Sequence, residues 1–188
     1  MSRIKVFFAL FALLFATLAC TMNIGGPDYP DATIPVSAQA VESMQAQFEA
    51  AFAAALLNGG DVILTVTEPQ ITSFLAIKLQ NQNSPLFTEP QVFLRDGSMQ
   101  IYGKATQGYF VANVKITVQV GVDEAGQPDI QIVSADFGPL PVPETLTASL
   151  AAIIKEAYTG AIGPVATGFR IEQIGIRDGF MVMSGKVK

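Results

Sequence analysis

One run of alternating residues near the middle of the chain constrains the fold more than any other feature. From Gly108 to Val122 every second position is apolar in an unbroken series: Phe110, Ala112, Val114, Ile116, Val118, Val120 and Val122. Successive side chains of a β-strand point to opposite faces, so this pattern predicts a strand with one continuous apolar face. A strand of this length spans about 50 Å, whereas a compact domain of about 150 residues is roughly 38 Å across. We therefore expect an elongated domain with a long, curved sheet.

The sequence before this strand predicts two helices. Within residues 37–57, apolar side chains recur three and four positions apart, at Val41, Met44, Phe48, Phe52 and Ala55. This spacing is typical of an amphipathic helix, and Ser37 is a suitable N-cap. Thr67 and Gln70 have the spacing of a capping box, in which each side chain bonds the backbone amide of the other residue. They predict a second helix that ends near Gln80.

The sequence after the long strand predicts a returning strand and a third helix. The apolar alternation of the returning strand shifts by one residue after Ile132, and a β-bulge near Val133 accounts for the shift. Residues 144–158 carry a helical period, with Leu146, Leu150 and Ile154 on one stripe.

Two further segments predict β-hairpins and resemble each other. Residues 92–105 (VFLRDGSMQIYGKA) and 174–187 (IGIRDGFMVMSGKV) align without a gap and share an Arg-Asp-Gly turn, a Met and a Gly-Lys pair. Asp-Gly turns are common in unrelated hairpins, so convergence explains part of the likeness. Duplication of a helix–hairpin unit is the alternative explanation, and both remain open from the sequence.

These elements together predict an α+β fold, in which amphipathic helices pack on the apolar face of an elongated, curved, mainly antiparallel sheet. The helices either cover that face completely, which gives a solid core, or leave a groove that an acyl chain could occupy. If a groove exists, we expect its lining to come from both layers: Phe74, Leu75, Phe110, Val114, Ile116, Val118, Val120, Leu150 and Ile154.

The N-terminus has the pattern of an export signal. Arg3 and Lys5 precede an apolar run from Val6 to Ala19, which is shorter than the roughly 20 residues that a membrane-spanning helix needs. The chain's single cysteine, Cys20, follows directly. This combination resembles a bacterial lipoprotein signal, in which the cysteine thiol takes a diacylglyceryl group and becomes the new N-terminus.

The predicted organisation follows from that signal. Residues 1–19 are a lipoprotein signal peptide, residues 20–36 are a lipidated Cys20 with a flexible tether rich in Gly and Pro, and residues 37–188 are one folded domain. An ordinary export signal with a chance cysteine is the alternative. Stable anchoring requires more than one acyl chain, and a lipoprotein anchor provides them.

The composition argues against several classes of function. The chain has no His and a single Cys, which excludes imidazole chemistry, an intrachain disulfide and a Cys-based metal site. Loss of residues 1–19 leaves nine basic and 16 acidic residues, a net charge of −7, which argues against a nucleic-acid partner. After residue 19 the sequence contains neither a GxSxG nor an SxxK motif, nor a glycine-rich phosphate loop. We expect a protein that is not an enzyme and that uses neither a cofactor nor a metal.

The folded part resembles the YpmS type of membrane-anchored bacterial proteins, which are related to the tubular lipid-binding (TULIP-like) superfamily. The segments that carry the resemblance are TVTEPQITSFLA (65–76), the two Arg-Asp-Gly hairpins and SADFGPLPVP (134–143). The resemblance implies an elongated apolar cavity that binds a lipid or another hydrophobic ligand. This chain departs from the family in carrying Cys20 where members often have a membrane helix.

Two hypotheses about function follow. The first is a lipoprotein, anchored by its lipid to the extracytoplasmic face of the cell membrane, that binds a lipid or another hydrophobic small molecule in an elongated apolar groove. The second is a non-catalytic structural or interaction module of the cell envelope, with a solid core and a protein partner in the envelope.

Overall fold

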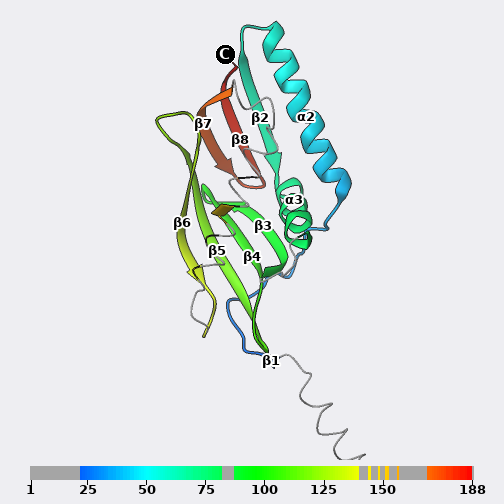
Figure 1. The fold of residues 1–188 in the computed structure, drawn as a ribbon, viewed down its shortest axis with the longest axis vertical. Helices are drawn as coiled ribbons and strands as arrows, with labels where there is room; N and C mark the ends of the chain where they lie inside the picture. The colour runs from blue at the N-terminus through cyan, green and yellow to red at the C-terminus, as the bar shows by residue number, and fades with distance from the viewer. Residues whose placement is uncertain are drawn as a thin grey trace, which may run out of the picture.

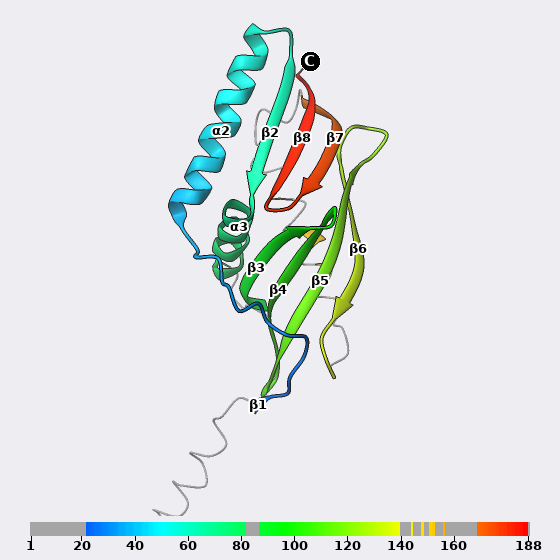
Figure 2. The ribbon, with the colours of Figure 1, turned by 180° about the vertical axis from the view of Figure 1, so that it is seen from behind.

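The fold is described by a computed structural model that covers residues 22–81, 87–139 and 169–187, together with residues 144, 148, 151, 152 and 156 (Figure 1). These residues form an elongated α+β structure with two helices and a strongly curled arrangement of strands. The helices are α2 (Ala38–Leu57) and α3 (Glu68–Gln80). Both lie on the same side of the strands, as the two opposite views show (Figures 1 and 2). The predicted fold class is confirmed.

The strands form two hydrogen-bonded sheets rather than one. The larger sheet has the order β1-β5-β4-β3, with β6 also paired to β5, and the smaller has the order β2-β8-β7. The bounds of the strands are β1 Met22–Asn23, β2 Asp61–Thr67, β3 Phe87–Arg95, β4 Ser98–Gln107, β5 Phe110–Val122, β6 Pro128–Asp136, β7 Phe169–Arg177 and β8 Phe180–Val187. Every pairing is antiparallel except that of β1 with β5.

Strand β5 is the axis of the larger sheet, and its middle forms the floor of the core. The side chains of Ala112, Val114, Ile116 and Val118 are completely buried, as the alternating pattern predicts. Phe110 at the start of the strand is 44% exposed, and Val120 and Val122 near its end are only partly buried. The strand therefore leaves the core at Phe110 and lies at its margin at Val120 and Val122.

The predicted bulge in β6 is confirmed. Thr117 of β5 pairs with Ser134, and the next residue, Val118, pairs with Ile132. Val133 is therefore the extra residue, and its side chain is 57% exposed. The bulge lets the apolar residues on both sides of it face the core despite the change of phase.

The same edge of β5 is shared by β6 and by the N-terminal segment. β6 pairs with β5 from Val122 down to Lys115, and below that point Asn113 donates its backbone N–H to the carbonyl of Gly25 at 2.9 Å. The two segments meet where Gly138 lies against Gly26, at positions where a β-carbon would overlap the backbone. Residues 22–26 thus complete the sheet edge, within the segment that the sequence predicted to be a flexible tether.

The starts of the helices follow local signals. Thr67 and Gln70 form the predicted capping box, with the Thr67 backbone N–H donating to Gln70 Oε1 at 3.0 Å. Ser37 is the N-cap of α2, but its hydroxyl makes no capping bond. Its backbone N–H instead donates to Ser73 Oγ at 3.1 Å, which joins the start of α2 to the buried side of α3.

Helix α3 protects the outer edge of strand β3. Val92 donates its backbone N–H to Thr72 Oγ1 at 3.0 Å, and Leu94 donates its own to Glu68 Oε1 at 2.7 Å. Glu68 and Thr72 lie one helical turn apart, and Val92 and Leu94 lie two residues apart on the strand. The helix thereby satisfies edge groups that would otherwise be available to another strand.

The tips of the two Arg-Asp-Gly hairpins meet at the start of α3. Gly179 donates its backbone N–H to the Leu94 carbonyl at 3.1 Å, and its own carbonyl accepts the Glu68 N–H at 3.2 Å. These bonds link the two sheets. They place one hairpin above the other along the long axis of the molecule (Figure 1).

Candidate ligand-binding cavity

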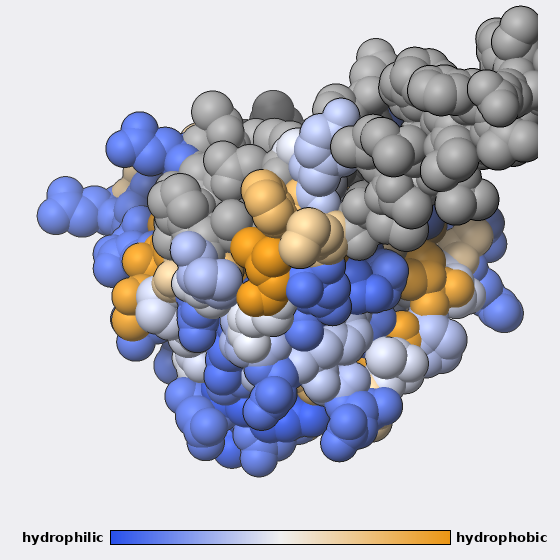
Figure 3. All heavy atoms as spheres, turned by 90° about the horizontal axis from the view of Figure 1, so that it is seen from below, coloured by the Kyte–Doolittle hydropathy of each residue, from blue (hydrophilic) through white to orange (hydrophobic). Residues whose placement is uncertain are grey.

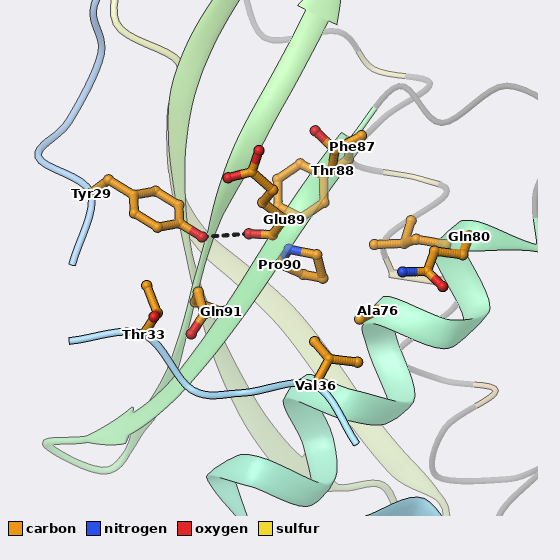
Figure 4. Close-up of a pocket in the computed structure, with 11 residues that line it drawn as sticks. Tyr29, Thr33, Val36, Ala76, Gln80, Phe87, Thr88, Glu89, Pro90 and Gln91 are labelled. Atoms are coloured by element: carbon orange, nitrogen blue, oxygen red, sulfur yellow. Dashed lines mark hydrogen bonds between the residues drawn. The ribbon is translucent and has the colours of Figure 1, made fainter. Parts of the chain in front are cut away.

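A cavity of about 530 Å³ lies near the beginning of β3, between an N-terminal segment, the end of α3 and β3 itself (Figure 4). The N-terminal segment from residue 27 to residue 37, which we call the strap, forms one wall. The last turns of α3 and the first half of β3 form the others. The lining residues are Tyr29, Thr33, Val36, Ala76, Leu79, Gln80, Phe87, Thr88, Glu89, Pro90 and Gln91.

The cavity forms at an irregularity in β3. The pairing of β3 with β4 skips from Thr88 to Gln91, so Glu89 and Pro90 have no partner in β4. Glu89 has a positive φ of 51°, and proline has no N–H to donate, which is tolerated at a bulge in an edge strand. The irregularity turns the side chains of this stretch towards the strap and α3 (Figure 4).

Hydrogen bonds to β3 hold the strap in place. The Tyr29 hydroxyl donates to the backbone carbonyl of Glu89 at 2.6 Å (Figure 4). The amide of Gln91 bonds both backbone groups of Ile34, with Oε1 accepting from the N–H at 2.6 Å and Nε2 donating to the carbonyl at 3.2 Å. Because the Gln91 side chain is almost fully buried, losing these partners would leave its amide unsatisfied.

The charged groups lie at one side of the cavity. Glu89 forms an ion pair with Lys104, with 2.7 Å between its carboxylate and the lysine Nζ. The Lys104 ammonium also lies 6.0 Å from the centre of the Tyr29 ring. Burial, with a further contribution from the negative charge of Glu89, raises the pKa of Tyr29 to about 12. The phenol is therefore protonated at neutral pH and remains a hydrogen-bond donor to the strand.

The remaining lining is mainly apolar. Val36, Ala76, Leu79, Phe87 and Pro90 supply aliphatic and aromatic surface from all three walls. Ligand pockets typically have volumes of about 300–1,000 Å³, apolar walls and a few polar groups that orient the ligand. This cavity has those properties, which suit a hydrophobic small molecule or an acyl chain with a polar end near Glu89. Among the described residues, no cluster of acidic or sulfur side chains could hold a metal ion.

The cavity lies close to the end of the domain at which the chain enters it. Thr88 pairs with Lys104, which pairs with Asn113, and Gln91 is connected through Tyr102 to Lys115 in the same way. These β5 positions are three to five residues, or about 10–17 Å, from Phe110. Phe110 pairs with Met22, the first residue that the structure describes.

The residues predicted to line a groove do not line this cavity. Phe74, Leu75, Val114, Ile116 and Val118 lie in the core and are at most 7% exposed, Val120 is partly buried, and Phe110 is 44% exposed. Cys20, Leu150 and Ile154 lie outside the described residues, as does most of the predicted helix 144–158. A groove between that helix and β5 therefore stays a prediction.

Sequence reasoning missed the cavity and the strap. Pro30 and Pro35 made this segment resemble an ordinary linker, and Pro90 concealed the first half of β3. One signal was available. Glu89-Pro90 directly precedes an alternating strand, and a proline there indicates an edge strand or a bulge.

Comparison of the chain with models of protein families, with curated proteins and with solved structures finds no match. The resemblance to YpmS-type proteins therefore stays a prediction. None of the described helices is long and apolar enough to span a membrane.

Proposed function

We propose that this protein is a non-catalytic lipoprotein, anchored through Cys20 to the extracytoplasmic face of the cell membrane, that binds a lipid or another hydrophobic small molecule. The observation that carries the proposal is the cavity of about 530 Å³ with its mainly apolar lining. The ligand's apolar part would contact Val36, Leu79 and Pro90, and its polar end would lie near Glu89 and its ion-pair partner Lys104.

The position of the cavity supports uptake from a membrane. Met22 pairs with Phe110, the first residue of β5, and Cys20 precedes Met22 by two residues. A diacylglyceryl group on Cys20 would hold this end of the domain at the membrane. The cavity, about 10–17 Å further along β5, would then lie close to the lipid headgroups.

The test of binding is a titration with a fluorescent fatty acid, using a variant that fills the cavity. Ala76 is buried and lines the cavity, so the ring of Ala76→Phe would occupy the space that the ligand needs. We expect the variant to weaken binding by about tenfold or more. Ala54→Phe, the same change at an exposed position of α2, is the matched control and should bind like the wild type.

Either of two results would contradict the proposal: absence of saturable uptake by the wild type, or equal uptake by the wild type and a folded Ala76→Phe variant. If Ala76→Phe fails to fold, Thr33→Phe fills the cavity from the exposed strap and provides the same comparison.

Anchoring is tested separately. We expect Cys20→Ser either to release the protein from membranes or to leave an uncleaved precursor. Unchanged membrane association of a cleaved Cys20→Ser protein would refute lipidation.

One observation favours the second candidate function, an interaction module with a solid core. Ala112, Val114, Ile116 and Val118 have no exposed surface, as a solid core requires. This candidate predicts no fatty-acid uptake by the wild type and a specific envelope protein recovered by crosslinking.

A further inference from the structure

Three exposed apolar side chains gather at the end of the domain where the chain enters it. The exposed fraction is 61% for Met22, 71% for Tyr109 and 44% for Phe110. Met22 donates its backbone N–H to the Tyr109 carbonyl at 2.8 Å and pairs with Phe110, so the three residues occupy one site. We call this group the apolar tip.

The two chain segments that carry the tip are uncharged. Residues 22–25 (MNIG) and 108–111 (GYFV) contain no acidic or basic residue. Viewed from this end of the molecule, hydrophobic surface gathers near the middle, and the surface below it is mainly hydrophilic (Figure 3). An exposed apolar patch with a polar surround is typical of a surface that contacts a partner or a membrane.

Chain geometry connects the tip to the predicted anchor. Consecutive Cα atoms are about 3.8 Å apart, so the Cα of Cys20 lies within about 7.6 Å of the Cα of Met22. If Cys20 carries lipid, the membrane surface must lie beside the tip, whatever path the two intervening peptide bonds take.

We propose that the apolar tip inserts into the interfacial layer of the membrane and sets the orientation of the domain. This inference rests on the lipidation of Cys20 in the proposed function. Tyrosine is enriched at membrane–water interfaces, where its ring contacts lipid and its hydroxyl contacts water, and Met22 and Phe110 supply apolar contacts beside it. The net charge of −7 after signal removal argues against attraction to anionic lipids, so the contact depends on apolar surface.

Insertion of the tip fixes which end of the elongated domain faces the membrane. The C-terminal end of α2 then points away from the membrane, because it lies at the opposite end of the molecule from β1 (Figures 1 and 2). The cavity lies on the membrane side of the molecule, near the tip.

The experiment uses tryptophan fluorescence, because the natural chain contains no Trp. Tyr109→Trp places one emitter at the tip, and Leu57→Trp places one at the opposite end, at a residue that is 85% exposed. The lipidated full-length proteins are reconstituted in phosphatidylcholine vesicles with plain or brominated acyl chains. We expect the Tyr109→Trp protein to lose more than about half of its emission with brominated lipid, because an interfacial ring lies next to the acyl chains. Leu57→Trp should lose almost none.

The outcomes separate this inference from the anchor. Vesicle flotation and the intact mass report whether Cys20 is acylated. If the Tyr109→Trp protein is acylated and floats but its emission is not quenched, the inference is overturned and the anchor is left intact. An unacylated protein that does not float and is not quenched would overturn both.

Emission from the Tyr109→Trp protein that is blue-shifted but unquenched would place the tip in a protein contact and would also overturn the inference. If the Tyr109→Trp protein does not fold, Phe110→Trp takes its place with the same expected quenching.

Discussion

The ring of Phe87 lies directly against Gly103 across the β3–β4 hairpin. A β-carbon at Gly103 would overlap the ring, and the ring itself is completely buried. The bulge at Glu89-Pro90 leaves Gly103 without a partner in β3, and the ring covers the backbone there. Because Phe87 also lines the cavity, the glycine helps to position a cavity wall.

The second hairpin repeats this relationship. Phe169 lies against Gly185, at the same separation in sequence as Phe87 and Gly103. Each hairpin also has a register shift soon after its phenylalanine. The ungapped alignment of residues 92–105 with 174–187 thus extends back to Phe87 and Phe169. This supports duplication of a helix–hairpin unit rather than convergence of two unrelated hairpins on the same turn.

We predict that Gly103→Ala displaces Phe87 and affects both stability and binding. Overpacking of this kind costs about 1–3 kcal/mol of unfolding free energy. Fatty-acid uptake should fall as well, since Phe87 lines the cavity and a ring displaced towards it would take up part of its volume. Urea unfolding and the fluorescence titration measure the two effects. The double variant Gly103→Ala with Phe87→Leu should recover part of the stability, and additive losses would contradict a direct contact.

Glu68 is predicted to stabilise the junction of the two hairpins. Its carboxylate accepts the Leu94 N–H and forms an ion pair with Arg95, and the Glu68 side chain is only 12% exposed. Glu68→Ala leaves the buried Leu94 N–H without a partner and should cost about 2–3 kcal/mol. Glu68→Gln keeps the acceptor and should cost less. Equal urea midpoints for Glu68→Ala and the wild type would show that the junction does not depend on this carboxylate.

The sequence predicted those elements whose signals are local. The alternation of β5, the phase change at Val133 and the Thr67–Gln70 capping box each lie within a few residues, and the structure contains all three. The α+β class follows from the same patterns.

The cavity could not be predicted because distant contacts create it. Ile34 and Gln91 are 57 positions apart in the sequence. The side-chain amide of Gln91 bonds both backbone groups of Ile34, as the backbone of a neighbouring strand would, so neither residue belongs to a periodic pattern in the sequence. Strand β1 has two residues and pairs through its backbone alone, which no side-chain pattern reveals. Five of the predicted groove residues lie in the core, because an apolar strand or helix face has the same pattern in both cases: Phe74, Leu75, Val114, Ile116 and Val118.

The strap should loosen at alkaline pH. In the folded protein the pKa of Tyr29 is raised to about 12 from its ordinary value of 10.0. The contribution of the protonated phenol to the free energy of unfolding is therefore complete below pH 10 and is lost as the pH rises towards 12. Tyr29→Phe removes the hydrogen bond to Glu89 and should cost about 1 kcal/mol at neutral pH. The loss of stability between pH 10 and 12 should be smaller in this variant than in the wild type. If the urea midpoints of the wild type and Tyr29→Phe fall in parallel between pH 10 and 12, the alkaline loss of stability does not come from Tyr29.

Deletion of Val133 should be tolerated. The residue has no partner in β5, and its removal joins Ile132 to Ser134 in the register that both already have. Deletion of Tyr102 from β4, which pairs on both edges, shifts a strand by one residue and turns its apolar side chains outward. We expect deletion of Val133 to lower the melting temperature slightly and deletion of Tyr102 to abolish the cooperative transition. Equal effects of the two deletions on thermal melting would argue against the bulge at Val133.

The central claim is that the cavity holds a hydrophobic ligand, and native mass spectrometry tests it most directly. Residues 21–188 would be exported behind an ordinary signal, so that neither an anchor nor detergent contributes to the mass. We predict an added mass of one lipid-like molecule that is present in the native spectrum, absent under denaturing conditions and much reduced in Ala76→Phe. A folded wild-type protein whose native mass equals that of its polypeptide, and which stays so after incubation with fatty acid, would contradict the claim.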